Sequence, residues 1–420
     1  MLREYFRNVG WLKEDGESLI GKSIIDEDKL EDYLIRLLKS PGPRRCISRF
    51  DVDLRLSPGV RFPLLDTVVG ILEEIYREND LDFDPANFIF EDNGNPVVTT
   101  SPDLTLIKFA PVKILVHGDQ PTFIIIGRAD NDNEWYIEPL HKAQIPLSSA
   151  VAIYSFRESR DSDKRIFKKI GEGEVRLEDG KYILKTMDDV TELDKVIYAC
   201  ETKAFDVKEV GRVIEGPAMD PRLSLAAALY AISELRRLGV PTALITSCDE
   251  EGLDRWAKLL SVTVDRWCTL DDIILESDLY DGSNLIGIDK IPAGSYVTSA
   301  LISGLLSFGK GGVNSDLAKL AIEMTGDMNE RGIDIVESTK AYCSRSCEHG
   351  IEEDAYYNIL AGPMGNVGEA GDSLGICHVG IERATLKQLK NMVKSIIYYV
   401  IVMTEIVHDY SARRKYITLT

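Results

Sequence analysis

The 420-residue sequence lacks an apolar run long enough to cross a membrane, and it lacks any excess of basic residues. Its most apolar stretch, Ile396 to Met403, is far shorter than the ~20 residues that a membrane-spanning helix needs. The chain has 49 Lys+Arg against 69 Asp+Glu, a formal net charge of −20. Proteins that bind nucleic acid or anionic lipid need a basic face, so we expect neither partner here.

Features of a secreted protein or a zinc finger are also lacking. The N-terminal sequence MLREYFRNVGW has no apolar signal-peptide core, from which we expect a cytoplasmic location. The seven cysteines are scattered, and an odd number without a signal peptide is typical of reduced thiols. Cys343 and Cys347, with His349 nearby, are compatible with zinc or redox chemistry, but no second cysteine pair lies at finger spacing.

Two kinds of pattern divide the chain. Helical spacing of apolar residues predicts helices over Lys29–Lys39, Asp66–Arg77 and Leu223–Leu238, and short strands such as Thr242–Ser247 alternate with the later helices. Between residues 123 and 206, short β-rich runs are separated by turn signals such as Asp179-Gly180.

These patterns predict an α/β fold, with a mostly parallel sheet flanked by helices and an inserted small β-barrel-like domain. The expected domains are residues 1–122 and 207–420, as two parts of one α/β domain, and residues 123–206 as the inserted β-rich domain.

Two residues that could carry chemistry stand at the ends of predicted elements. His117 follows the apolar run Val112–Val116, where it could bind a metal while Asp119 orients its imidazole ring. The alternative is a turn with a hydrogen-bonded histidine. Asp220 precedes a long helix, where it could bind a metal or simply cap the helix, with Pro221 at the first helical position.

Three further segments carry carboxylates or a histidine near predicted strands and helices. Asp249, Glu250 and Glu251 follow an apolar strand, and three adjacent carboxylates repel one another unless cations or protons compensate. Open α/β sheets hold their sites at such strand ends. Asp278 follows another strand, and His378 precedes the last helix. A solvated helix start or a surface loop is the alternative for each segment.

Imidazole and carboxylate ligands suit zinc, cobalt or manganese. Two such ions held close together polarise a carbonyl group and activate a water molecule. A nearby carboxylate that binds no metal can then act as a general base. The residues are therefore compatible with a pair of divalent metal sites.

The order of these residues is more specific than any one of them. The chain has His117-Gly-Asp119 after a strand, a β module, Asp220, a Glu-Glu pair, Asp278 and then His378. This order resembles the TET-type (glutamyl/deblocking) dinuclear metallo-aminopeptidases, within the wider zinc exopeptidase superfamily. His117 and Asp220 are separated by 220 − 117 = 103 residues. This spacing resembles that of the family, which inserts a β-barrel-like domain between the corresponding residues. The segment LSFGKGGV, residues 306–313, and Glu382 after His378 also resemble family segments.

The resemblance implies a hydrolase that cleaves peptide bonds, an aminopeptidase acting on short peptides with two divalent ions (zinc, or cobalt or manganese). Asp220 would bridge both ions, Glu250 would be the general base and Asp119 would brace a ligand. The implied metal ligands are His117, Asp220, Glu251, Asp278 and His378. It also implies a homo-oligomer.

Two departures from the family pattern leave alternatives open. An alternative register makes Asp249 the catalytic base and Glu250 the metal ligand. Pro221 stands where the family usually has Asp or Asn. These departures favour, as a second hypothesis, a catalytically silent relative with a binding or structural role. A third is a deacylase of N-acyl amino acids, as in related hydrolases.

Overall fold

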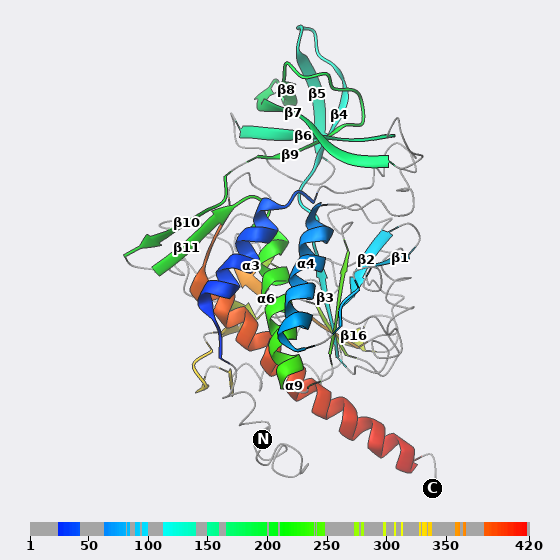
Figure 1. The fold of residues 1–420 in the computed structure, drawn as a ribbon, viewed down its shortest axis with the longest axis vertical. Helices are drawn as coiled ribbons and strands as arrows, with labels where there is room; N and C mark the ends of the chain where they lie inside the picture. The colour runs from blue at the N-terminus through cyan, green and yellow to red at the C-terminus, as the bar shows by residue number, and fades with distance from the viewer. Residues whose placement is uncertain are drawn as a thin grey trace.

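The fold was examined in a computed structural model of the chain. It describes residues 24–42, 63–80, 82–84, 89–92, 95–99, 112–139, 149–158, 165–199, 201–208, 211–238, 240, 242–247, 273–276, 279–280, 297–299, 306–307, 312–313, 327–328, 330–333, 335–337, 358–361, 364–366 and 382–417. The described residues form a six-stranded sheet with helices packed on it, a closed barrel and three smaller sheets (Figure 1).

The main sheet has six strands in the order β1-β2-β12-β3-β13-β19. Their bounds, in that order, are Ile89–Asp92, Asn95–Thr99, Ala243–Ser247, Val112–His117, Ile273–Glu276 and Asn358–Ala361. The pairings among β12, β3, β13 and β19 are parallel, whereas β1 and β2 form an antiparallel edge. The sequence patterns do not predict this β1–β2 hairpin.

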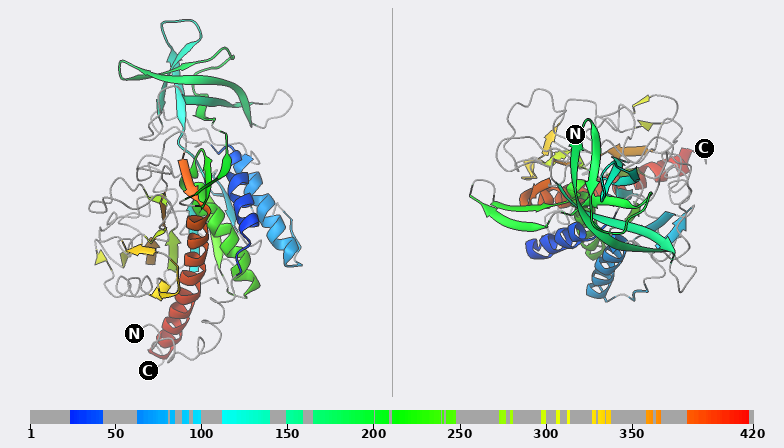
Figure 2. Two further views of the ribbon diagram at one scale, coloured as in Figure 1. Left: turned by 90° about the vertical axis from the view of Figure 1, so that its left-hand side faces the viewer. Right: turned by 90° about the horizontal axis from the view of Figure 1, so that it is seen from above.

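Four helices are described in full length: α3 (Glu27–Lys39), α4 (Pro63–Glu78), α6 (Met219–Arg237) and α9 (Leu386–Ile417). Helices α4 and α6 pack on the main sheet, and α6 lies between α3 and α9 (Figures 1 and 2). The predicted helices in the first hundred residues agree with α3 and α4 to within three residues at each end. Among the described helices, none combines the length and apolar character needed to cross a membrane.

One hydrophobic core joins these elements. It contains fully or almost fully buried side chains from α3, α4, β3, α6 and α9, among them Leu34, Leu72, Ile114, Leu229 and Ile397. Residues that precede the barrel in the chain and residues that follow it therefore share one core. Burial of an aliphatic side chain of this size contributes about 1.5–3 kcal/mol, so this core is a main source of stability.

A closed barrel of six strands stands at one end of the molecule (Figure 1). Its strand order is β4-β5-β8-β7-β6-β9, with bounds Phe123–Arg128, Glu134–Pro139, Lys181–Lys185, Arg165–Glu178, Ser149–Glu158 and Lys195–Tyr198. It has a separate core that includes Phe123, Val175 and Val196. The barrel agrees with the β-barrel-like module predicted over this part of the sequence.

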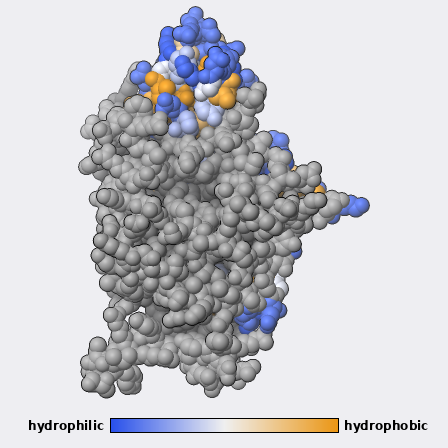
Figure 3. Space-filling view, turned by 180° about the vertical axis from the view of Figure 1, so that it is seen from behind, coloured by the Kyte–Doolittle hydropathy of each residue, from blue (hydrophilic) through white to orange (hydrophobic). Residues whose placement is uncertain are grey.

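The barrel surface combines a hydrophilic tip with hydrophobic side chains lower down (Figure 3). Leu177 and Met187 are the exposed large hydrophobic residues among the described barrel residues, at 44% and 82% exposure.

Three smaller sheets complete the described structure. One has the order β10-β11-β21, and its hairpin β10–β11 projects from the body of the molecule (Figure 1). The others have the orders β14-β20-β15-β18 and β16-β17. The bounds of β10, β11 and β21 are Lys203–Val207, Gly211–Gly216 and Glu382–Thr385. Those of β14, β20, β15, β18, β16 and β17 are Leu279–Tyr280, Met364–Asn366, Val297–Ser299, Ile335–Glu337, Leu306–Ser307 and Gly312–Val313.

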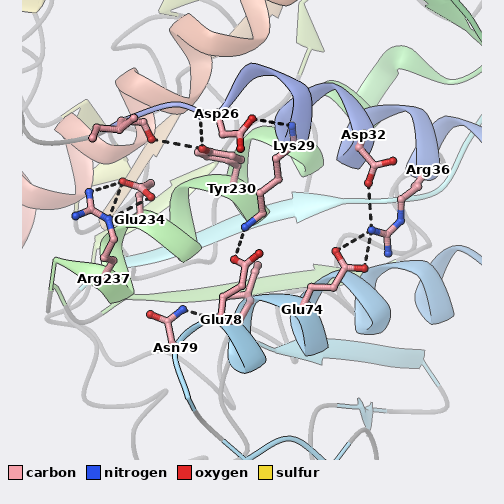
Figure 4. A network of polar contacts seen from close by, with 12 residues as sticks. Asp26, Lys29, Asp32, Arg36, Glu74, Glu78, Asn79, Tyr230, Glu234 and Arg237 are labelled. Carbon is pink, nitrogen blue, oxygen red and sulfur yellow. Dashed lines mark hydrogen bonds and ion pairs between the residues drawn. The ribbon is translucent and has the colours of Figure 1, made fainter.

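Polar contacts join α3, α4 and α6 on their outer side (Figure 4). Lys29 of α3 pairs with Glu78 of α4, and Nη1 of Arg36 lies 2.8 Å from Oε1 of Glu74. The hydroxyl of Tyr230 on α6 accepts a hydrogen bond from the backbone N–H of Asp26, at 2.7 Å. Ion pairs between partly exposed side chains contribute only about 0–1 kcal/mol each, so these two pairs add little to the stability of the helix packing.

Candidate active site

Three parallel strands of the main sheet end together at one edge. His117, the last residue of β3, pairs with Ser247, the last residue of β12. On the other side of β3, Glu276 at the end of β13 pairs with Leu115. Asp249 therefore follows the end of β12 by two residues, and Asp278 follows the end of β13 by two residues. The three strands that carry or precede predicted ligands in the sequence therefore end at the same side of the sheet.

The β10-β11-β21 sheet joins the strands that precede α6 and α9. Strand β11 leads directly into α6, which carries Asp220, and β21 leads directly into α9. Gly216 of β11 pairs with Glu382 of β21. His378 precedes Glu382 by four residues, and Asp220 follows Gly216 by four residues. The antiparallel pairing thus brings the chain before α9 close to the chain that begins α6.

Five of the predicted site residues lie outside the described part of the chain: Asp249, Glu250, Glu251, Asp278 and His378. For His117 and Asp220 the structure describes the backbone, at the end of β3 and in the first turn of α6. Among the described residues, no group of three or more His, Cys, Asp or Glu side chains is arranged to hold a metal ion.

The first turn of α6 differs from the sequence prediction. The helix begins at Met219, so Asp220 lies inside it, and Ala218 is the N-cap residue. Interpreting Asp220 as the helix cap is therefore wrong, and Pro221 is at the third helical position rather than the first. Proline is tolerated there because the first N–H groups of a helix have no partner within the helix.

Ala218 has a left-handed backbone conformation, with φ 57° and ψ 42°. Its side chain is only 2% exposed. A residue with a Cβ atom is disfavoured in this region by roughly 1–2 kcal/mol. The left-handed conformation of Ala218 turns the chain sharply between β11 and α6, immediately before the helix that carries Asp220.

Asp119 lies in the loop between β3 and β4, and its side chain is completely buried. A buried carboxylate is costly unless other groups hydrogen-bond to it or compensate its charge. Its burial two residues after His117 is compatible with the predicted bracing role. The neighbouring loop residues Gln120 and Thr122 are also buried, so this loop is an internal part of the fold.

Sequence reasoning missed two residues beside the candidate site, Arg222 and Gln120. Arg222 is completely buried in the first turn of α6, and its Nη2 lies 3.4 Å from Oε1 of Gln120. Its Nη1 donates to the backbone oxygens of Leu37 and Ser40, at 2.5 and 2.8 Å. The available signal was an arginine at the start of the otherwise apolar helix RLSLAAALYAI.

No family model and no curated protein matches the sequence. Three solved structures illustrate the structural similarity. The TET aminopeptidase of Thaumarchaeota archaeon SCGC AB-539-E09 has a TM-score of 0.59 and 12% identity, and the match covers 90% of this chain and 100% of that one.

The second is the TET1 peptidase of Pyrococcus horikoshii, which can assemble into a tetrahedron or a large octahedral shell. It has a TM-score of 0.55 and 15% identity over 88% of this chain and 99% of that one. The third is an M18-family aminopeptidase from Thermotoga maritima. It has a TM-score of 0.53 and 12% identity, and the match covers 91% of this chain and 98% of that one.

These similarities define the class of fold. The chain has the fold of the TET-type and M18 aminopeptidases, which extends over about nine tenths of its length. The resemblance predicted from the order of site residues is confirmed at the level of the fold.

Proposed function

We propose that this protein is a two-metal hydrolase that cleaves peptide bonds, as an aminopeptidase acting on short peptides. The observation that carries the proposal is the alignment of the carboxyl ends of β3, β12 and β13. Strand β3 ends at the predicted ligand His117, and β12 and β13 are each followed within four residues by a predicted ligand. The aminopeptidase fold over about nine tenths of the chain supports it independently.

The donor set fits two divalent cations. Imidazole and carboxylate oxygen are ligands of zinc, cobalt and manganese alike. The proposed ligands are His117, Asp220, Glu251, Asp278 and His378. When bound, two such ions would polarise the peptide carbonyl and lower the pKa of the attacking water molecule.

The chain's own residues have separate roles in this proposal. Glu250 takes a proton from the attacking water and passes it to the leaving amine. The buried carboxylate of Asp119 fixes the orientation of the His117 ring, as outer carboxylates do at many metal sites. In the alternative register, Asp249 is the base and Glu250 is a ligand.

The proposed domain arrangement follows from the shared core. We infer that residues 1–122 and 207–420 form one catalytic domain with a mostly parallel sheet, and that residues 123–206 are inserted into it. Core residues contributed by β3, before the barrel, and by α6, after it, support this division. We further propose a cytoplasmic homo-oligomer whose substrate is a peptide, without nucleic-acid or membrane partners.

The test compares hydrolysis of aminoacyl chromogenic substrates by wild type, Glu250→Ala and His378→Ala. Glu250→Ala should lose at least about 10²-fold in rate, the usual scale for general acid–base catalysis. His378→Ala should also lose activity, because it removes a proposed metal ligand. Glu192→Ala on the barrel and His408→Ala on α9 are matched controls that should retain activity. Unchanged activity in both Glu250→Ala and His378→Ala overturns the proposal.

A catalytically silent protein is the second candidate, favoured by Pro221 and by the Asp249-Glu250-Glu251 register. It predicts no hydrolysis of any substrate and no bound zinc, cobalt or manganese after incubation with each ion. A parallel panel of N-acyl amino acids tests the deacylase alternative, which requires their hydrolysis while aminoacyl substrates remain intact.

A further inference from the structure

Arg222 is the largest of the completely buried side chains among the described residues. It lies two residues after Asp220, in the first turn of α6, and its guanidinium reaches the carboxyl end of α3. There its Nη1 donates to the backbone oxygen of Leu37, at 2.5 Å, and to that of Ser40, at 2.8 Å. The last carbonyl groups of a helix have no partner within the helix and carry its negative dipole end, so a cation there is favourable.

The same guanidinium also holds the loop that follows His117. Its Nη2 lies 3.4 Å from Oε1 of Gln120, and this oxygen also accepts from the backbone N–H of Gly42, at 3.3 Å. The backbone N–H of Gln120 donates in turn to the oxygen of Gly42, at 3.0 Å. Because both neighbours of Oε1 are donors, the orientation of the Gln120 amide is defined.

The Gly42 backbone completes this cluster at very close range. A Cβ atom at Gly42 would lie 2.7 Å from Nη2 of Arg222 and 2.9 Å from a methyl carbon of Leu64. The guanidinium is therefore enclosed by the α3 terminus, the Gly42 segment and the loop after β3. Its planar arrangement of donors allows one side chain to contact all three, which the single ammonium group of lysine does not.

We propose that Arg222 is a positioning residue for the proposed two-metal site. It fixes the first turn of α6, which carries Asp220, relative to the loop that follows His117. Two predicted metal ligands from distant parts of the sequence thus depend on one buried guanidinium for their separation. This inference rests on the proposed function, because it assigns Arg222 a role toward ions bound by those two residues.

The test measures binding of Co²⁺ to metal-free full-length protein by visible absorption, apart from any assay of hydrolysis. Replacing residues around metal ligands typically weakens metal binding about 10–100-fold. Arg222→Met should show a loss in this range and an altered cobalt spectrum. Arg222→Lys, which retains the charge without the planar group, should have intermediate affinity. Arg237→Met, at the other end of α6, is the matched control and should bind as wild type does.

A folded Arg222→Met that binds cobalt with wild-type affinity and spectrum overturns the inference and leaves the proposed function intact. Wild-type cobalt affinity in Arg222→Lys also overturns the inference, because a positive charge without the planar guanidinium would then be sufficient to position the two ligands. Wild-type protein that binds no cobalt contradicts the proposed function, and this inference with it.

If circular dichroism shows that Arg222→Met does not fold, Gln120→Met carries the test. This variant removes the contact to the loop and leaves the two carbonyl contacts of Arg222 in place. It should weaken cobalt binding several-fold, and unchanged binding in folded Gln120→Met overturns the inference.

Discussion

Ser247 and His117 lie directly opposite each other, at the carboxyl ends of the parallel strands β12 and β3. The pairing continues back to Ala243 and Lys113, so the register extends over all five residues of β12. Neighbouring residues of β12, Ala243 and Leu244, are both buried, so this strand is covered on both faces, as is typical of a parallel sheet. The carboxylate cluster at residues 249–251 therefore starts within two residues of the strand end beside His117.

The two glycines Gly42 and Gly70 should respond oppositely to alanine. Gly42→Ala places a Cβ atom 2.7 Å from Nη2 of Arg222 and should lower the free energy of unfolding by roughly 1–3 kcal/mol, as overpacking does. Gly70 is inside α4, where the nearest atom to a new Cβ would be 3.6 Å away. Gly70→Ala should stabilise by about 0.5–1 kcal/mol through helix propensity. Denaturant titration measures both, and equal effects would contradict the packing described around Arg222.

Ala218 and Ala228 form a second matched pair. Ala218→Gly relieves the left-handed backbone but removes a buried methyl group, so the free energy of unfolding should change by only about 0 to +1 kcal/mol. Ala228→Gly, in the middle of α6, should lower it by about 1–2 kcal/mol because glycine disfavours the helix and the methyl group is lost. A larger loss for Ala218→Gly than for Ala228→Gly would contradict the N-cap geometry.

The packing of α9 in the main core predicts a large loss of stability when one of its buried side chains is shortened. Ile397 of α9 is 1% exposed within the main core, so Ile397→Ala should lower the free energy of unfolding by about 2–5 kcal/mol. Met187→Ala on the barrel is the control, because this side chain is 82% exposed and its removal should change stability by less than about 0.5 kcal/mol. Chemical denaturation followed by circular dichroism distinguishes the two.

Glu134 should make the barrel sensitive to acid. The side chain of Asn131 donates to its Oε2, at 2.9 Å, and that of Arg176 to its Oε1, at 2.9 Å. The hydrogen bond from Asn131, together with Arg176, holds the pKa of Glu134 below its ordinary value of 4.5, while partial burial opposes the shift. A lowered pKa stabilises the folded state above the ordinary value, and this contribution is lost as the pH falls through the folded pKa.

The melting temperature of wild type should therefore fall more steeply than that of Glu134→Gln between about pH 6 and about pH 3. The exposed residue Glu192 provides the control, and Glu192→Gln should follow the wild-type curve. Parallel curves for wild type and Glu134→Gln would show that the Glu134 carboxylate does not contribute to the dependence of the melting temperature on pH.

Local patterns predict the helices well and the barrel strands less completely. The expected helix Leu223–Leu238 corresponds to α6, which begins four residues earlier, because the proline and aspartate of its first turn resemble a cap. The sequence indicates only Glu174–Leu177 of the fourteen-residue strand β7. The rest of β7 includes Lys168, Lys169, Gly171, Glu172 and Gly173, residue types that are depleted in strands, and these residues hide the β pattern.

Contacts between distant segments account for what the sequence did not predict. Arg222 is 185 residues from Leu37, and nothing in either local sequence indicates their hydrogen bond. Strand β10 has no buried residue, so it lacks a strong apolar alternation, whereas β11 is buried over its last four residues. For the site, the order of residues along the chain indicated the class of fold. The pairing of β3 with β12 and β13 depends on sheet topology, which spacing alone does not determine.

Anomalous X-ray scattering at the zinc absorption edge, from crystals grown with zinc, tests the central claim most directly. Two peaks are expected at the carboxyl ends of β3, β12 and β13, about 2.0–2.2 Å from the proposed ligands His117, Asp220, Glu251, Asp278 and His378. Zinc bound instead by Cys343 and Cys347, or no peak beside the ends of these strands, would contradict it.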